Sequence, residues 1–225
     1  MRKKVFISLL FILLFSACAT VENSSNNTSN NIETSNSGEN YYSSAIAYLG
    51  IKNYELAKIN FLKAIQYHYN LVGSYYYLGL IEYSQNNLEL AEKYLLKCLK
   101  LNDKITDAHN TLGAIYAKKK QYRKAIEEFK KVLKDTSYLF PENALYNLAL
   151  LHYNLKEYDE SIKYCKKCLF IVPKSPAVYY LMGLDYYNKK NIQQARYYMM
   201  QIVREFPDNI WGSKAKIFLK EKKLW

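Results

Sequence analysis

The sequence has little of what tight turns and phosphate-binding loops require. Only seven glycines and four prolines occur among 225 residues. An all-β fold needs many tight turns, and loops that cradle phosphate need clustered glycines, so both are disfavoured. The chain also lacks an apolar run of the roughly 20 residues that a membrane-spanning helix needs. What it has in excess is tyrosine: all 24 lie between Tyr41 and Tyr198, which separates a structured body from the preceding segment.

The first 17 residues have the three parts of an export signal. Three basic residues (2–4) precede an apolar run (5–15), and two small residues (16–17) stand directly before Cys18. This order is typical of a secretory signal peptide. Small residues before a cysteine resemble the lipobox of bacterial lipoproteins, and the resemblance implies that Cys18 becomes the lipidated first residue of the mature protein. An ordinary cleaved signal or an uncleaved anchor is the alternative.

Residues 18–40 form a segment of very different composition. It is dominated by Asn, Ser and Thr, and after Cys18 it contains three glutamates and no Lys, Arg, Tyr or Phe. Such a chain buries too little apolar surface to offset the entropy of ordering, so we predict a flexible tether. Ala19, directly after the cysteine, implies by the lipoprotein resemblance a lipid-anchored protein of the bacterial cell envelope, in the outer membrane and facing the periplasm.

Small residues recur at a fixed spacing through the body of the chain. A first set of small residues has spacings of 34, 34, 36 and 34 residues along the chain. A second set lies 12 positions before the first, one small residue for each. The first set is Ala57, Ala91, Ala125, Ser161 and Ala195, and the second is Ala45, Gly79, Gly113, Ala149 and Gly183. Helices that cross closely need small residues at the contact, so the spacing predicts stacked helix pairs.

The same segments contain relaxed forms of a known helical-repeat motif, such as His109-x2-Leu112-Gly113-x2-Tyr116. Over 172 residues the chain resembles the tetratricopeptide repeat (TPR) family, whose period is about 34 residues. The resemblance implies an all-α fold, a right-handed α-solenoid of five helix pairs, with the repeats in residues 41–209 and a C-terminal capping helix after them. The five repeat frames are 38–71, 72–105, 106–141, 142–175 and 176–209.

Residues 210–225 read as one amphipathic helix. Trp211, Ala215 and Phe218 share one face at i, i+4 and i+7, and lysines occupy the rest. The end of a repeat array must be covered by a helix with a polar outer face, so we interpret this segment as the cap. The alternative is a basic helix that lies on a membrane surface.

The TPR resemblance implies a concave surface lined by the first helix of each pair. Repeat positions 5, 9 and 12 face it, and in three repeats they read Tyr-x3-Leu-x2-Tyr. These spacings lie on one helical face, and tyrosines offer an apolar ring with a polar tip to a partner's helix or extended segment. The alternative is that the rings pack between neighbouring helices. The predicted partner-binding groove consists of Tyr42, Ile46, Tyr76, Leu80, Tyr83, Asn110, Tyr146, Leu150, Tyr153, Tyr180, Leu184 and Tyr187.

The third repeat departs from this stripe, because Asn110, Ala114 and Ala117 take the three positions. We expect a smaller and more polar floor there. Position 5 is tyrosine in the other four repeats, where TPR clamps that grip chaperone C-termini have lysine, so that class of ligand is disfavoured.

The body of the chain is strongly basic. The three basic residues of the signal and the three glutamates of the tether cancel, so residues 41–225 carry the whole net charge of +12. An exported protein rarely meets nucleic acid, so we expect no nucleic-acid partner. Anionic lipid head groups, cell-wall polymers or an acidic protein are the candidate attractions. The alternative is that the lysine clusters only solvate the outer face.

Catalytic motifs are absent from the sequence. It contains no H-E-x-x-H or G-x-S-x-G motif, and its histidines (His68, His109 and His152) lack metal-ligand spacing. Cys165 and Cys168 form a C-x2-C pair within an expected second helix, where buried packing is favoured over a redox or metal role. We therefore expect no enzymatic activity, no cofactor and no metal.

These observations predict a membrane-anchored scaffold that binds a protein or peptide segment of an envelope complex. Asn143 to Tyr153 after a lengthened third repeat, together with a final F-P-D before the last helix, resembles the type IV pilus biogenesis lipoprotein (pilotin) family. That resemblance implies a role in secretin and pilus assembly. A lipoprotein of the β-barrel assembly machinery and a cell-wall adaptor that recruits peptidoglycan enzymes are the alternatives. The partner's identity and the oligomeric state stay open.

Overall fold

The computed structural model describes residues 37–225. The predicted signal, Cys18 and most of the predicted tether lie outside the described residues. The chain divides into two compact units, which meet in sequence between Asn102 and Asp103.

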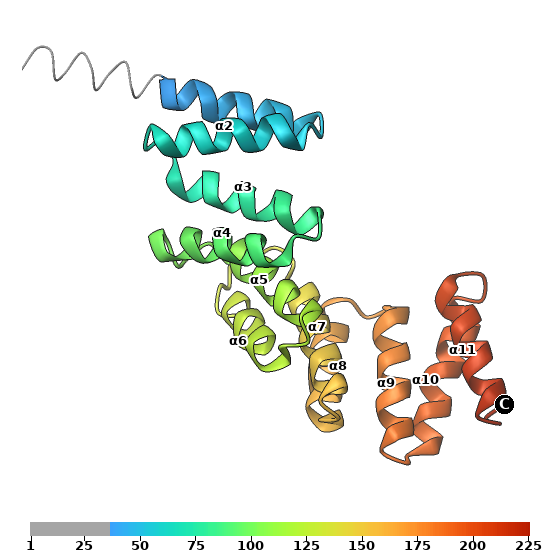
Figure 1. The fold of residues 1–225 in the computed structure, drawn as a ribbon. Coiled ribbons are helices and arrows are strands. Elements are labelled where there is room, and N and C mark those ends of the chain that lie inside the picture. The colour runs from blue at the N-terminus through green and yellow to red at the C-terminus, as the bar shows by residue number, and fades with distance from the viewer. Residues whose placement is uncertain (1–36) are drawn as a thin grey trace, which may run out of the picture. The chain divides into compact units, whose positions relative to one another are not determined.

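The N-terminal unit consists of two helix pairs (Figure 1). A first helix, described over residues 37–50, is followed by α2 (Tyr54–Gln66), α3 (Leu71–Ser84) and α4 (Leu88–Leu101). Asparagine caps begin two of these helices: the Asn53 side chain accepts from Leu56 N at 3.3 Å, and the Asn70 side chain accepts from Gly73 N at 3.0 Å. Both bonds satisfy an N–H that the helix itself leaves unpaired.

The C-terminal unit consists of three helix pairs and a final helix (Figure 1). Pro141 and Pro176 each occupy the first position of a helix, where the missing N–H costs no helical hydrogen bond. The helices are α5 (Thr106–Lys118), α6 (Tyr122–Val132), α7 (Pro141–Asn154), α8 (Tyr158–Ile171), α9 (Pro176–Asn188), α10 (Ile192–Glu205) and α11 (Ile210–Glu221).

The turn inside each helix pair has the same backbone form. One non-glycine residue per turn has a left-handed φ between 57° and 64°, and these residues repeat at the spacing of the small residues. They are Lys52, Asn86, Lys120, Lys156 and Lys190. In the second pair the next residue, Asn87, donates its N–H to Glu82 O at 2.9 Å, which closes the end of α3. The 34-residue period is thus present in the backbone as well as in the sequence.

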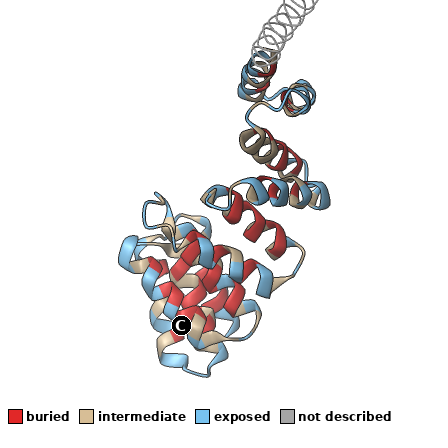
Figure 2. Cartoon of the chain, turned by 90° about the vertical axis from the view of Figure 1, so that its left-hand side faces the viewer, coloured by how far each residue is buried: buried red, intermediate tan, exposed pale blue. Residues whose placement is uncertain are grey.

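Small residues let the two helices of a pair approach closely. The first set of repeated small residues, Ala57 to Ala195, is fully buried. A Cβ added at Gly79 would lie 2.6 Å from Leu95 Cγ, and one added at Gly113 would lie 2.9 Å from the Phe129 ring. Within the unit that carries the C-terminus, the buried residues lie on helix faces that meet one another (Figure 2). The predicted all-α repeat fold is confirmed, and residues 37–225 contain no strand.

The first helix already includes residues 37–40, which the composition assigned to the tether. Gly38 gives the reason: it is buried, and a Cβ there would lie 2.6 Å from Tyr69 Cβ and 3.0 Å from Tyr67 Cβ. The composition of residues 37–40 does not indicate this close contact. The tether prediction is therefore wrong for these four residues, which belong to the first helix. Among the described residues, no helix has both the length and the apolar character needed to cross a membrane.

Candidate partner-binding surface

All twelve predicted groove residues lie in the first helix of a pair. Tyr42 and Ile46 are in helix 37–50, Tyr76, Leu80 and Tyr83 in α3, Asn110 in α5, Tyr146, Leu150 and Tyr153 in α7, and Tyr180, Leu184 and Tyr187 in α9. Their surroundings differ from one helix to the next.

In the N-terminal unit, the Tyr42 ring packs inward as well as facing solvent. It meets Phe61 edge-on at 5.6 Å between ring centroids and lies 5.9 Å from Tyr69. Burial, followed by the nearby Tyr77 and Tyr69 hydroxyls, raises the pKa of Tyr42. Ile46, one turn further along the helix, is 36% exposed. The packing alternative therefore applies to part of the Tyr42 ring, while Ile46 is open to a partner.

In the C-terminal unit, the three groove residues of α7 differ in burial. Tyr146 is partly buried, and burial raises its pKa, with a further contribution from Cys165 and Cys168 on α8. Leu150 is 38% exposed in the middle of the helix. The hydroxyl of Tyr153 accepts a hydrogen bond at 3.5 Å from Asn188 Nδ2 on α9. Tyr153, like Tyr146, is partly buried, and its ring lies 5.9 Å from Tyr158, so Leu150 is the exposed member of this row.

A cavity of about 330 Å³ lies beside Leu150, between the α5–α6 hairpin and α7. Ala117 lines it at the position where three other repeats have tyrosine, so the small side chain expected in the third repeat contributes to this space. Phe129 and Leu151 add apolar walls, and the polar groups come from Lys118, Lys120, Tyr122, Asn147 and Asn154. A mostly apolar hollow with a few polar groups is the usual form of a binding pocket.

Asn110, the polar residue of this row, has an unusual environment. Its Oδ1 atom is buried, and it accepts no hydrogen bond from any described residue. A buried acceptor without a donor costs about 1–3 kcal/mol. The Oδ1 atom of Asn110 is therefore covered rather than open to a partner.

In the fifth repeat, the predicted groove residues pack against α11. The Tyr180 ring lies 5.5 Å from Trp211 and 6.4 Å from Phe218, and Tyr187 meets Phe218 edge-on at 5.3 Å. Leu184 packs against the same cluster. The terminal helix thus buries its apolar face on α9 and α10, the arrangement expected of a cap, and it covers much of the surface that these tyrosines would otherwise offer.

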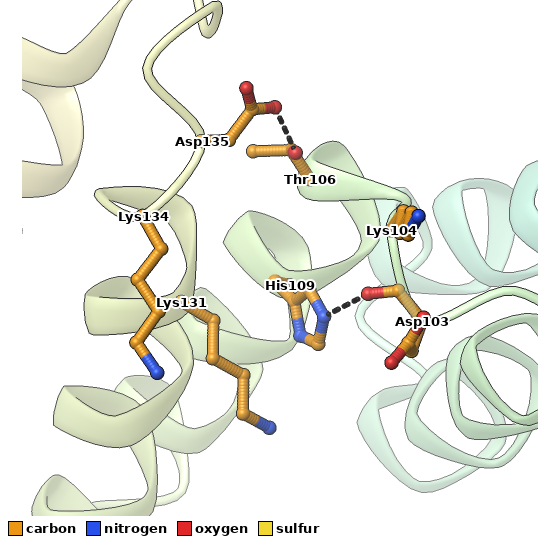
Figure 3. A pocket seen from close by; sticks show the side chains of 7 residues that line it. All are labelled: Asp103, Lys104, Thr106, His109, Lys131, Lys134 and Asp135. Atoms are coloured by element: carbon orange, nitrogen blue, oxygen red, sulfur yellow. Dashed lines mark hydrogen bonds between the residues drawn. The ribbon is translucent and has the colours of Figure 1, made fainter.

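A second hollow, of about 500 Å³, opens between the start of α5 and the end of α6 (Figure 3). Lys104, Lys131 and Lys134 line it, with Thr106 and His109. In Figure 3 the Lys131 and Lys134 side chains extend on the opposite side of the hollow from Lys104. Asp103 and Asp135 also line it, so the three lysines share the hollow with two acidic residues.

The histidine in this hollow has no nitrogen left for chemistry. His109 Nε2 donates to Asp103 O at 2.9 Å, because a carbonyl can only accept (Figure 3). His109 Nδ1 lies 2.6 Å from Glu128 Oε2. The other carboxylate oxygen, Glu128 Oε1, accepts a hydrogen bond from Lys131 Nζ at 2.8 Å. Burial alone would raise the pKa of Glu128, but these two hydrogen bonds lower it below its ordinary value. The ring therefore joins α5 to α6 and cannot serve as a general base or metal ligand in this arrangement.

The three described cysteines are unpaired and buried. Burial raises the pKa of Cys98 to about 11 and also raises the pKa of Cys165 and of Cys168. A thiol becomes a nucleophile or metal ligand as the thiolate, which burial disfavours here. The geometry of the Cys165–Cys168 pair therefore favours packing over redox chemistry.

Comparison with protein families agrees with this repeat architecture. A family model described as the C-terminal ARM domain of tetratricopeptide repeat protein 21 matches residues 10–180, and a tetratricopeptide repeat model matches residues 177–209. The chain belongs to the tetratricopeptide repeat family. TPR proteins are generally non-catalytic scaffolds, and the fold is consistent with protein–protein interaction.

Individual TPR relatives are distant in sequence. An uncharacterized protein of Haemophilus influenzae is 27% identical over 156 residues, which cover 69% of this chain and 84% of the relative. PilF of Pseudomonas aeruginosa has a TM-score of 0.63 at 19% identity, covering 84% of this chain and 93% of its own. YrrB, described as a TPR protein with an unusual peptide-binding site, has a TM-score of 0.70 at 19% identity, covering 78% and 90%. At these identities the two solved structures show the fold alone.

The exposed apolar residues at one end of the α7–α8 pair were not singled out from the TPR sequence. They include Leu139 in the α6–α7 loop and Phe170 in the last turn of α8. Leu139 lies where the third repeat is two residues longer, and Phe170 lies outside the repeat motif. An apolar residue in an insertion was the available signal for the first, and no repeat pattern pointed to the second.

Proposed function

We propose that this protein is a non-catalytic TPR scaffold that binds a helical or extended segment of another envelope protein. The binding surface lies within the C-terminal unit, on α7, where exposed Leu150 stands one turn from partly buried Tyr153. A lipid on Cys18 holds the scaffold at the outer membrane on the periplasmic side. The export-signal pattern, the small residues before Cys18 and the polar segment after it support this placement.

One observation carries the binding surface: Leu150 is 38% exposed and lines the 330 Å³ cavity beside α7. Leu145, Leu148 and Leu151 of the same helix are buried. The core of the helix pair is therefore complete without Leu150. Its apolar surface, next to a hollow and to the Tyr153 ring, suits an apolar anchor residue from a partner.

For the pathway, we propose assistance in type IV pilus or secretin assembly. The sequence pattern at residues 143–153 supports this, as does the fold shared with PilF. The peptide-binding description of YrrB supports a peptide segment as the bound element. A role in β-barrel assembly or in recruiting peptidoglycan enzymes predicts a different partner on the same surface, so partner identification separates the three.

The experiment is affinity capture from detergent-solubilised envelopes, with mass spectrometry of the retained proteins. The full lipoprotein is compared with a Leu150→Ser, Tyr153→Ser double variant. Ile217→Ser on α11 is the matched control, because Ile217 is also an exposed mid-helix side chain but lies outside the predicted groove. The double variant should retain at least about tenfold less of the main partner protein than the unchanged lipoprotein does. The control variant should retain the same amount as the unchanged lipoprotein.

The retained protein then decides the pathway. A secretin or pilus component agrees with the proposed role, whereas barrel-assembly proteins or peptidoglycan enzymes favour an alternative. A partner retained equally by the double variant would contradict the binding surface. Circular dichroism of each variant shows that the helices remain.

The anchor is tested separately by Cys18→Ser and cell fractionation. We expect the variant to leave the membrane fraction, since it lacks the acylated cysteine. Unchanged membrane association would contradict a lipid anchor at Cys18, while the capture experiment could still succeed.

A further inference from the structure

The two most exposed large apolar side chains among residues 37–225 are Phe170 and Leu139. Phe170 is 90% exposed in the last turn of α8, and Leu139 is 81% exposed in the α6–α7 loop, next to Phe140 at 55%. Apolar side chains that extend this far into water contribute nothing to folding. Such side chains mark an interaction surface where they gather at one place rather than occur singly.

These side chains belong to one end of the α7–α8 pair. The helix α7 begins at Pro141, directly after Phe140, and α8 ends at Ile171, directly after Phe170. The two ends are in contact, because Cys168 Sγ lies 3.6 Å from Glu142 O. The α6–α7 loop and the end of α8 therefore form one edge of the C-terminal unit, which we call the apolar edge (residues 129–141 and 161–175).

The apolar edge is also strongly basic. Its two segments contain seven lysines and one acidic residue, and three glutamates, Glu128, Glu142 and Glu160, directly flank them. That acidic residue, Asp135, is engaged within its own surroundings: Thr106 Oγ1 donates to one carboxylate oxygen at 2.5 Å, and Ser137 donates to the other through N at 3.0 Å and Oγ at 2.6 Å. The lysines are Lys130, Lys131, Lys134, Lys163, Lys166, Lys167 and Lys174.

Several of these lysines are open to an external anion. Three of the seven pair with neighbouring glutamates: Lys131 with Glu128, Lys163 with Glu160, and Lys174 with Glu205. No ion pair within residues 37–225 engages the other four, which are Lys130, Lys134, Lys166 and Lys167, although Lys167 Nζ lies over the Tyr164 ring at 5.6 Å from its centroid. The edge therefore combines projecting apolar groups with uncompensated positive charge.

We propose that the apolar edge docks on the surface of a bilayer that contains anionic phospholipids. Phe170, Leu139 and Phe140 enter the boundary between head groups and acyl chains, and the lysines contact lipid phosphates. Projecting apolar side chains on segments that also carry exposed lysines match a fluid anionic surface, which adapts to them. This goes beyond the proposed function, because the edge binds a membrane without the lipid on Cys18 and would fix the scaffold's orientation at the end of its tether.

The test is sedimentation with vesicles of phosphatidylcholine alone or with one quarter phosphatidylglycerol. The protein is the chain from residue 18 onward with serine at position 18, which keeps every described residue and carries no acyl group. We expect binding to the anionic vesicles that weakens with salt, and at least about tenfold less binding to the neutral ones.

Two variants locate the surface. Phe170→Ser with Leu139→Ser should reduce the bound fraction at least about fivefold, because the apolar insertion is lost. Ile217→Ser, which removes another exposed apolar side chain outside the edge, should bind as the parent does. Equal binding by the double variant, equal binding to neutral vesicles, or no binding by the parent would each overturn the proposal. Capture of a protein through Phe170 without vesicle binding would overturn it as well.

Discussion

Ser161 donates a hydrogen bond to Asp185 at 2.7 Å across the α8–α9 contact, and both residues are fully buried. The other carboxylate oxygen, Asp185 Oδ1, is buried and has no hydrogen-bond partner among residues 37–225. Burial raises the pKa of Asp185 from 3.8 to about 7, although the bond from Ser161 and the nearby Lys189 oppose this and Asp159 adds to it. A carboxyl group at the centre of a helix contact therefore keeps its proton to a much higher pH than an exposed aspartate does.

This relationship predicts a pH dependence of stability. A group whose pKa is higher in the folded than in the unfolded protein costs nothing below its unfolded pKa and destabilises the fold as pH rises to its folded pKa. Raising the pH from about 4 to about 7 should cost up to about 4 kcal/mol at this site. Asp185→Asn keeps an acceptor for Ser161 but cannot ionise, so its urea midpoint should fall less over that range than the parent's.

The control for that comparison is Asp208→Asn, an exposed aspartate near the start of α11. It should keep the parent's slope of urea midpoint against pH. Identical slopes for Asp185→Asn and the parent would show that Asp185 ionises normally in the folded protein.

Close helix contact predicts a cost for one added methyl group. At Gly79 the new Cβ would lie 2.6 Å from Leu95 Cγ, so Gly79→Ala should destabilise the protein by about 1–3 kcal/mol. Gly50 is also helical, but nothing lies within 4 Å of an added Cβ. Gly50→Ala should therefore be neutral or stabilising by up to about 1 kcal/mol. Urea midpoints measure both, and an equal loss at the two positions would refute close packing as the cause.

The repeated left-handed turns predict a stabilising substitution. Lys156 has a φ of 62°, a region that glycine enters without a steric penalty. Lys156→Gly should therefore stabilise the protein, by about 1 kcal/mol. The same replacement at exposed Lys166, inside α8, should destabilise it by about 1 kcal/mol. Thermal unfolding of both variants checks the opposite signs, and a loss at both positions would contradict the left-handed turn.

The buried thiols predict slow alkylation. Because burial raises the pKa of Cys98, Cys165 and Cys168, the native protein should react with iodoacetamide at least about 100-fold more slowly than the urea-unfolded protein. Mass spectrometry of timed samples follows each site. Fast labelling of Cys165 in the native protein would contradict its burial and favour a redox role for Cys165 and Cys168.

The fold was predictable because its signal is local and periodic. Residues such as Gly79 and Ala91 must be small wherever two helices cross, so the requirement recurs at every repeat. The turn residue Lys156 was not predictable in the same way, since a left-handed φ is usually marked by glycine. Its conformation is set by the helices on either side.

The candidate site was predictable only in part. Repeat position assigns Tyr146 and Tyr180 to the same kind of surface, yet Tyr180 meets Trp211 of α11 because the array ends there. Asp185 was not singled out, because its low exposure depends on how α8 packs on α9. Such effects arise from tertiary neighbours, which a residue's place in its own repeat does not specify.

The most direct test of the scaffold account is photo-crosslinking in intact cells. A photoreactive phenylalanine analogue replaces Leu150 in the predicted row or, as the matched exposed position, Ile217 on α11. The account predicts a crosslink from position 150 to one discrete envelope protein, absent from position 217. A crosslink from position 217 alone, or none from position 150, would contradict the claim that the first-helix row binds the partner.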